Sequence, residues 1–330
     1  MSELAVAAFA AESGEHVLAA PRHERFRRFA RSFDERAYRE RLRSFGVSWL
    51  PRSAAGFPRG LASIFDPPAG LFLRGTAAAA VLDAPAVGVV GARSCSHYGA
   101  QVARTLGLEL AGAGLVVVSG LARGIDGEAH RGALEAGGLT VAVLGCGIDR
   151  DYPASHAELA RRIRETGLVV SEYGLGVEPA PWRFPARNRI VAGLAEVTVV
   201  VEARERSGAL ITADLALEEG REVFAVPGEI TSALSSGSNR LLALGATPLL
   251  EAADVLRSFG IEPRVRAGAA DLGADAARAL AALADGPASV DDLVATTALD
   301  AGALAAGLSE LELAGLVAEG EGLYRRTVGS

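Results

Sequence analysis

The chain has 330 residues, half of them hydrophobic, and a formal net charge of −7. This length is sufficient for a large core and for more than one domain. The net acidity excludes a generally basic nucleic-acid coat, so any DNA site has to be a local patch. Because all 33 basic residues are arginines, every basic side chain that contacts a phosphate does so with a planar guanidinium.

Several other classes of protein are also disfavoured. No apolar run is long enough to cross a bilayer, and Glu3 and Glu12 argue against a signal peptide, so we expect a cytoplasmic protein without membrane contact. Cys95 and Cys146 are too few for a disulfide framework or a zinc site, so we expect no metal.

Residues 1–84 are predicted to form an N-terminal, Arg-rich helical segment. Within it, 22–52 carries ten arginines against four acidic residues, a local charge of +6. Such a run indicates either an auxiliary nucleic-acid surface or a solvated helical face, and we favour the solvated face. The stretch 65–70, which contains two prolines and a glycine, ends any helix.

Residues 85–260 alternate apolar runs with amphipathic stretches. Six Val-rich runs are typical of strands buried on both faces, at 87–90, 115–119, 140–144, 168–171, 197–201 and 222–226. Stretches of helical length lie between them, including 99–111, 128–136, 156–165 and 210–219. This alternation predicts an α/β fold with a doubly wound parallel sheet, in which ligands bind beyond the carboxyl ends of the strands.

The C-terminal part is predicted to be a linker at 261–275 and a winged-helix module at 276–330. Three short helices are expected at 276–283, 290–296 and 301–313, followed by a hairpin of 316–319 and 322–325. The third helix contains no basic residue and carries Glu310 and Glu312, whereas a DNA-reading winged helix usually has a basic recognition helix. We therefore expect protein contact or a structural role, which disfavours a winged-helix transcription regulator with an α/β sensor domain.

The first predicted strand ends in a loop that contains Gly91, Arg93 and Ser94. Glycine lets backbone N–H groups approach an anion, and the following helix offers its positive N-terminus. A tight strand-to-helix turn would explain the glycine but not Arg93, which is a bidentate partner for phosphate. The spacing is not G-x-G-x-x-G and no Walker lysine is present, so we expect no nucleotide cofactor.

The second strand ends in a similar loop with Gly120, Arg123 and Gly124. Asp126 is predicted to cap the following helix. The alternative, an acid–base pair of Asp126 with His130, is disfavoured because no nucleophile lies at an interpretable spacing.

The loop after the fourth strand leads into a helix whose first turn contains Pro185. Arg187 and Arg189 then lie near a helix N-terminus, where cations are unfavourable unless an anion is bound among them. The alternative is a salt bridge to Glu172 or Glu202, and we favour phosphate binding.

The next loop contains Ser207, a predicted N-cap, and Gly208. Five or six such loops meet at one end of the sheet. Together they predict a long anion-lined groove rather than a closed pocket for one small molecule.

Over about residues 65–260 the sequence closely resembles the DNA-processing protein A (DprA/Smf) family. The resemblance rests on long, ordered motifs, including GARSCSHYG at 91–99, SGLARGIDGEAHRGAL at 119–134, FPARNRIVAGL at 184–194 and GSNRLLALGA at 237–246. The tail 276–326 is similar to the C-terminal module of the family.

The resemblance implies an extended Rossmann-like, mostly parallel sheet and a protein that binds single-stranded DNA. It also implies protection of incoming DNA, help in loading RecA during natural transformation, a homodimer and no established catalysis. Arg183 falls where the family usually has a basic residue. The loops and the resemblance together assign DNA binding to Gly91, Arg93, Ser94, Gly120, Arg123, Gly124, Arg183, Arg187, Asn188, Arg189, Ser207 and Gly208.

An enzyme is the main alternative. Related Rossmann-like domains cleave nucleotides at the N-glycosidic bond, and Glu172 or Glu202 could supply a carboxylate. The Pro-Gly-Gly-x-Gly-Thr loop typical of those enzymes is absent, apart from Pro227 and Gly228. We therefore expect that the protein is not an enzyme.

Overall fold

The computed structural model describes residues 2–13, 24–262, 272–320 and 322–326. They form two compact units, one of Met1–Leu250 with Asp254–Phe259 and one of Glu251–Ala253 with Gly260–Ser330. Most of the predicted linker, residues 263–271, lies outside the described residues.

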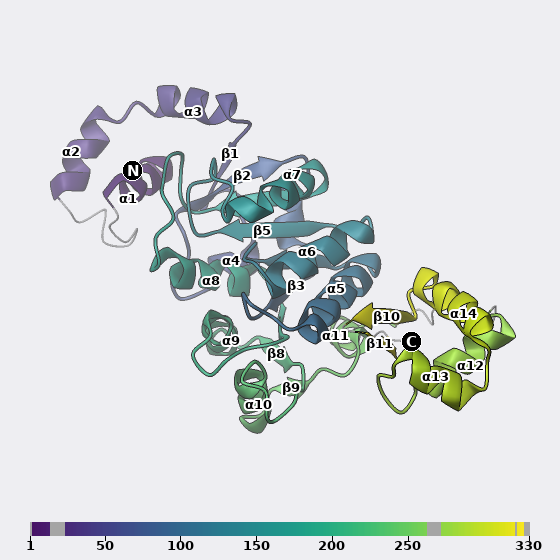
Figure 1. Cartoon of the computed structure of the whole chain (residues 1–330). Coiled ribbons are helices and arrows are strands. Elements are labelled where there is room, and N and C mark those ends of the chain that lie inside the picture. The colour runs from purple at the N-terminus through teal and green to yellow at the C-terminus, as the bar shows by residue number, and fades with distance from the viewer. Residues whose placement is uncertain (1, 14–23, 263–271, 321, 327–330) are drawn as a thin grey trace. The chain divides into compact units, whose positions relative to one another are not determined.

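Within the described part of the first unit, nine strands form one sheet in the order β1-β2-β6-β5-β4-β3-β7-β8-β9 (Figure 1). The pairs β1–β2 and β2–β6 are antiparallel, and all other neighbours are parallel. The strands are β1 (Ser48–Pro51), β2 (Gly70–Gly75), β3 (Ala86–Val90), β4 (Val116–Ser119), β5 (Thr140–Leu144), β6 (Leu168–Ser171), β7 (Val197–Val200), β8 (Glu222–Ala225) and β9 (Thr247–Pro248).

The six predicted strands are confirmed as β3 to β8, in a mostly parallel α/β sheet. The structure adds β1 and β2, which come from the segment 1–84 that we expected to be helical. Leu71 and Phe72 of β2 are fully buried in the sheet, and β1 pairs with β2 along its outer side. Both runs are short, because Pro51 ends the first and Gly70 and Gly75 bound the second, so their alternation is too brief to predict a strand.

Helices cover both faces of the sheet, as the side chains of β5 show. Val141 and Val143 lie in one core with Ile190 of α8, whereas Ala142 and Leu144 lie in the other core with residues of α7. On one face α5, α6 and α7 pack in sequence, and on the other α8 contacts α4 and α9. These helices are α4 (Arg59–Ala62), α5 (His97–Gly112), α6 (Ile125–Glu135), α7 (Ala157–Thr166), α8 (Arg183–Leu194) and α9 (Gly208–Glu218), followed by α10 (Ser236–Ala243) and α11 (Ala252–Ser258).

Three helices precede the sheet: α1 (Glu3–Ser13), α2 (Glu24–Ser32) and α3 (Glu35–Ser44). They are held by apolar side chains, among which Phe26 and Leu42 are almost completely buried. The described residues of this part of the chain, up to Ser44, are thus largely helical, as expected.

The second unit contains three helices and a hairpin, in the order predicted for a winged-helix module. They are α12 (Ala274–Ala282), α13 (Val290–Thr297), α14 (Ala301–Leu313), β10 (Val317–Gly320) and β11 (Leu323–Arg326). Leu293, Leu304 and Leu311 are fully buried in a core of its own. Across the described ranges of both units, no helix combines the length and hydropathy needed to cross a membrane.

Candidate nucleic-acid interface

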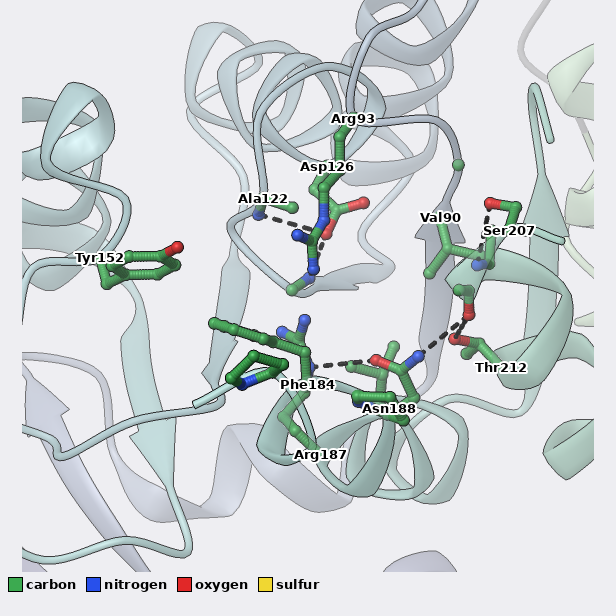
Figure 2. A pocket seen from close by; sticks show the side chains of 17 residues that line it. Val90, Arg93, Ala122, Asp126, Tyr152, Phe184, Arg187, Asn188, Ser207 and Thr212 are labelled. Atoms are coloured by element: carbon green, nitrogen blue, oxygen red, sulfur yellow. Dashed lines mark hydrogen bonds between the residues drawn. The ribbon is translucent and has the colours of Figure 1, made fainter. Parts of the chain in front are cut away.

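A cavity of about 450 Å³ lies at the carboxyl ends of β3 and β4, where a parallel sheet binds its ligands (Figure 2). The first turns of α8 and α9 bound it with Pro185 and Ala209, so two helix N-termini with partial positive charge face the same space. Seven of the predicted DNA-binding residues line this cavity: Gly91, Arg93, Gly120, Arg187, Asn188, Ser207 and Gly208.

The loops after β3 and β4 approach each other closely. Gly124 has a φ of +73°, and a Cβ atom there would overlap the carbonyl oxygen of Ala92. The backbone N–H of Ile125 donates a hydrogen bond of 3.2 Å to the same oxygen. Gly124 does not line the cavity, but its lack of a side chain lets the loop that carries Arg93 adopt its position.

Arg93 is an exposed cation at the mouth of the cavity. Its guanidinium carbon lies 5.1 Å from the ring centroid of Phe184, and that ring stacks on Tyr152 with centroids 5.4 Å apart. In the described parts of the chain, no carboxylate forms an ion pair with Arg93. The arrangement offers one unpaired charge beside two aromatic rings.

The aromatic residues of this site were missed by our sequence analysis. Phe184 opens the motif that carries Arg187, and Tyr152 lies in the connection between β5 and α7, so both belong to segments that follow a strand of the sheet. Aromatic residues interleaved with arginines at the carboxyl ends of parallel strands are the signal that could have indicated them.

Arg187 lies beneath Arg93 and is buried, with 4% of its surface exposed. It donates to the backbone oxygen of Val143, and its Nε lies 3.2 Å from Oδ1 of Asn188. Burial lowers the pKa of Arg187, and the nearby carboxylate of Asp126 opposes this shift. A guanidinium this constrained acts as a fixed positive charge in the cavity floor.

Asp126 has a different role from the one predicted. The N-cap position of α6 is taken by Gly124, and the Asp126 carboxylate accepts hydrogen bonds from the backbone N–H groups of Gly120 and Ala122, at 3.1 and 3.3 Å. Burial raises the pKa of Asp126, and Arg187 opposes that shift. The side chain therefore fixes the loop that it follows.

His130 does not form an acid–base pair with Asp126. Its Nδ1 lies 2.7 Å from Oγ1 of Thr140 in the fully buried core, and burial lowers the pKa of His130 to about 3. The histidine is a neutral core residue.

The predicted N-cap at Ser207 is confirmed, because its Oγ accepts a hydrogen bond of 3.3 Å from the N–H of Ala209. Nδ2 of Asn188 donates to the backbone oxygen of Gly208 at 3.0 Å. The contact of Asn188 ties the second turn of α8 to the first turn of α9, and both residues line the cavity (Figure 2).

Arg189 lies away from the cavity and is neutralised within the protein. Its Nη1 and Nη2 each lie 2.7 Å from a carboxylate oxygen of Glu172, and its Nε lies 3.1 Å from Asp66. Of the two interpretations of the arginines in α8, the structure gives Arg189 the salt bridge and leaves Arg187 in the cavity.

Three further predicted residues also lie outside the cavity lining. Arg183 is almost fully buried, with its guanidinium 5.3 Å from the ring of Tyr173 and 4.8 Å from the ring of Trp182, and it donates to the backbone oxygen of Glu178. It stabilises the loop before α8. Ser94 and Arg123 are exposed on the two loops beside the cavity.

Both carboxylates considered for catalysis are occupied by structural contacts. Glu172 is paired with Arg189, and the Glu202 carboxylate accepts from Ser96 N at 2.9 Å and from Ser96 Oγ at 2.5 Å. Among the described residues, no group of three His, Cys, Asp or Glu side chains could hold a metal ion.

Models of two protein families match the chain. The family described as DNA recombination-mediator protein A matches residues 49–260, which begin in β1 and include the whole sheet apart from Ser48. The family described as the DprA winged helix domain matches residues 262–322.

Curated proteins and solved structures give the same assignment. The chain is 47% identical over 205 residues to DNA processing protein DprA of Streptococcus pneumoniae (62% of this chain, 71% of the relative), and 41% identical over 223 residues to that of Bacillus subtilis (68% and 73%). The X-ray structure of DprA from S. pneumoniae superposes with a TM-score of 0.66 at 41% identity, over 70% of this chain and 80% of that chain. A structure of DNA processing protein A from Helicobacter pylori, described by its single-stranded DNA binding mode, gives a TM-score of 0.58 at 31% identity (64% and 95%). The protein therefore belongs to the DprA/Smf family of DNA-processing proteins.

Proposed function

We propose that this protein binds single-stranded DNA at the cavity beyond β3 and β4. The observation that carries the proposal is the exposed guanidinium of Arg93, which has no carboxylate partner among the described residues and lies 5.1 Å from the ring centroid of Phe184. A cation beside an aromatic face recognises a phosphate and an unstacked base together, which only a single strand offers.

The contacts divide between the two parts of a nucleotide. Arg93 binds the phosphate with two parallel hydrogen bonds, and the positive ends of α8 and α9 and the buried charge of Arg187 strengthen the local field. The ring of Tyr152, which is 40% exposed and packs on Phe184, stacks on a base. Because every base has a π-face, we expect binding with little sequence preference.

The single-stranded DNA binding mode described for the H. pylori relative supports this proposal. Neither Glu172 nor Glu202 has an oxygen left without a structural partner, which gives no support to a glycosidase-type enzyme.

The test is a competition between labelled single-stranded and duplex DNA over a salt series. We expect a preference for the single strand and an affinity that falls with salt, because neutralised phosphates release counterions. Arg93→Ala combined with Phe184→Ala should remove most of the binding, whereas Arg162→Ala, an exposed arginine of α7, should not. Wild-type affinity in the double variant would refute the cavity assignment.

We further propose that the bound strand is protected and passed to RecA during natural transformation, as the family resemblance implies. The measurable consequence is faster RecA assembly on a single strand in the presence of this protein. RecA-dependent ATP hydrolysis that does not change on addition of the wild-type chain would refute this step.

We also propose a homodimer through the first unit. Leu217, Leu244 and Leu250 are each at least half exposed, and they lie on or beside the elements at the β9 end of the sheet. Exposed apolar side chains beside a short edge strand are typical of a covered surface. Sedimentation should give a dimer for the wild type and a monomer for Leu244→Glu.

A further inference from the structure

The helix α2 carries an arginine surface that is separate from the cavity. Arg27, Arg28 and Arg31 are all exposed, and their spacing of three and four residues places them on neighbouring positions of one helix. Within the described ranges of the chain, none of the three forms an ion pair with a carboxylate.

The neighbouring helix α3 differs in this respect. Arg36 pairs with Glu40 and Arg39 pairs with Glu35, both across one helical turn. The chain contains 40 acidic residues and 33 basic ones, so carboxylates are abundant. Arg27, Arg28 and Arg31 are nevertheless left for a partner outside the protein to neutralise.

An aromatic cluster fixes the outward direction of these arginines. Phe26, on the opposite side of α2, is fully buried, and Phe29 packs on Phe9 and Phe33 with ring centroids 5.5 and 5.3 Å apart. Because the apolar side of α2 faces the protein, its arginines face solvent.

The same cluster connects α2 to the loop that leads into the cavity wall. Phe33 packs on Tyr38 of α3, and the hydroxyl of Tyr38 lies so close to Gly174 that a Cβ atom there would overlap it. Gly174 follows Tyr173, whose ring contacts Arg183 at the start of α8. In Figure 1, α2 lies on the side of the sheet at which β5 ends.

We infer that Arg27, Arg28 and Arg31 form a second contact surface for the phosphodiester backbone of the same single strand that occupies the cavity. The inference rests on the proposed function. A cavity of about 450 Å³ holds only a short piece of DNA, so a longer strand continues over the surface beyond the carboxyl ends of the strands. On that side α2 presents three cations without an internal partner.

The test uses the full chain with Arg27, Arg28 and Arg31 changed together to Gln, which keeps a similar helix propensity. Affinity is measured over a salt series for a short oligothymidylate of about six nucleotides and a long one of about thirty. For the long strand, we expect the slope of log K against log salt to become shallower by about 2, since each lost contact removes about 0.7. For the short strand, we expect the slope and the affinity to be those of the wild type.

A matched control changes Arg104, Arg161 and Arg162 to Gln, which lowers the net charge by the same three units on α5 and α7. The control should bind both strands as the wild type does. Equal behaviour of the α2 variant and the control on the long strand would overturn the inference. Equal weakening of the short and long strands by the α2 variant would also overturn it.

Failure of the proposed function has a different signature. In that case the wild type does not bind the short strand, or Arg93→Ala leaves its affinity unchanged. Circular dichroism of the α2 variant checks that the helix is intact, and binding of the short strand checks that the cavity is intact.

Discussion

The guanidinium of Arg189 and the carboxylate of Glu172 form a bidentate ion pair in the protein interior, with both nitrogen–oxygen distances at 2.7 Å. The two side chains are only 11% and 5% exposed. This pair gives Arg189 a structural role, as in the case of Arg183, and leaves Arg187 as the arginine of α8 that lines the cavity.

Removing one partner of this pair should destabilise the protein strongly. Glu172→Gln leaves the Arg189 charge buried with Asp66 as its one carboxylate partner among the described residues, and breaking a buried pair costs about 3–5 kcal/mol. Urea denaturation should show this loss in the free energy of unfolding. Arg36→Gln, which breaks the exposed pair with Glu40, should leave the urea concentration at the midpoint of unfolding almost unchanged. Equal midpoints for the two variants would contradict the structural role of Arg189.

Gly120→Ala should weaken DNA binding while the fold is retained. The added Cβ would overlap the guanidinium of Arg187 and force it from its position in the cavity floor. Displacing this charge weakens the field at the phosphate, and an effect the size of one charge-assisted hydrogen bond, about 1.5–3 kcal/mol, is about a 10- to 150-fold rise in Kd. Gly56→Ala is the matched control, because no atom lies within 4 Å of its added Cβ. Fluorescence anisotropy with a short single strand distinguishes the two variants.

Substitutions of Tyr152 should distinguish the contribution of its ring to DNA affinity from that of its hydroxyl group. Tyr152→Phe keeps the stacking on Phe184 and should bind DNA as the wild type does. Tyr152→Leu removes the ring, and loss of one base–aromatic stack costs about 1–3 kcal/mol, about a 5- to 150-fold rise in Kd. The control is Phe45→Leu, which is similarly exposed but lies outside the cavity. Equal affinity of the Leu and Phe variants at 152 would exclude stacking.

Stability should fall in mild acid because of His130. Burial lowers its pKa from 6.5 to about 3, so between these values the unfolded chain binds a proton that the folded chain does not. The contribution of His130 to the free energy of unfolding is complete above pH 6.5. It decreases by about 1.4 kcal/mol per pH unit as the pH falls toward 3.

Comparison with His130→Asn isolates this effect. Asn does not titrate, so the variant should lack the part of the pH dependence of the free energy of unfolding that His130 causes. Groups such as Asp126 contribute equally to the pH dependence of both proteins. The measurement is the free energy of unfolding in urea at several pH values between about 4 and 7. Parallel pH profiles for the two proteins would contradict a neutral, buried His130.

Much of the architecture was predictable because burial leaves a local periodicity in the sequence. Continuous Val-rich runs indicated β3 to β8, and the order of three helices and a hairpin indicated the winged helix. Glycine and arginine at strand ends indicated a site at the carboxyl edge, because parallel strands bring those ends together. Ser207 was recognised as an N-cap because its contact with Ala209 is local.

The partners of the arginines in α8 depended on the tertiary structure. Arg189 contacts Asp66 across 123 residues of sequence, and Arg187 contacts Val143 across 44, so no local pattern records either contact. The packing of Phe184 between Tyr152 and Arg93 was likewise decided only by the fold. Local side-chain chemistry determines which residues can bind an anion. Whether a particular arginine remains available to do so depends on which distant segment the folded chain places beside it.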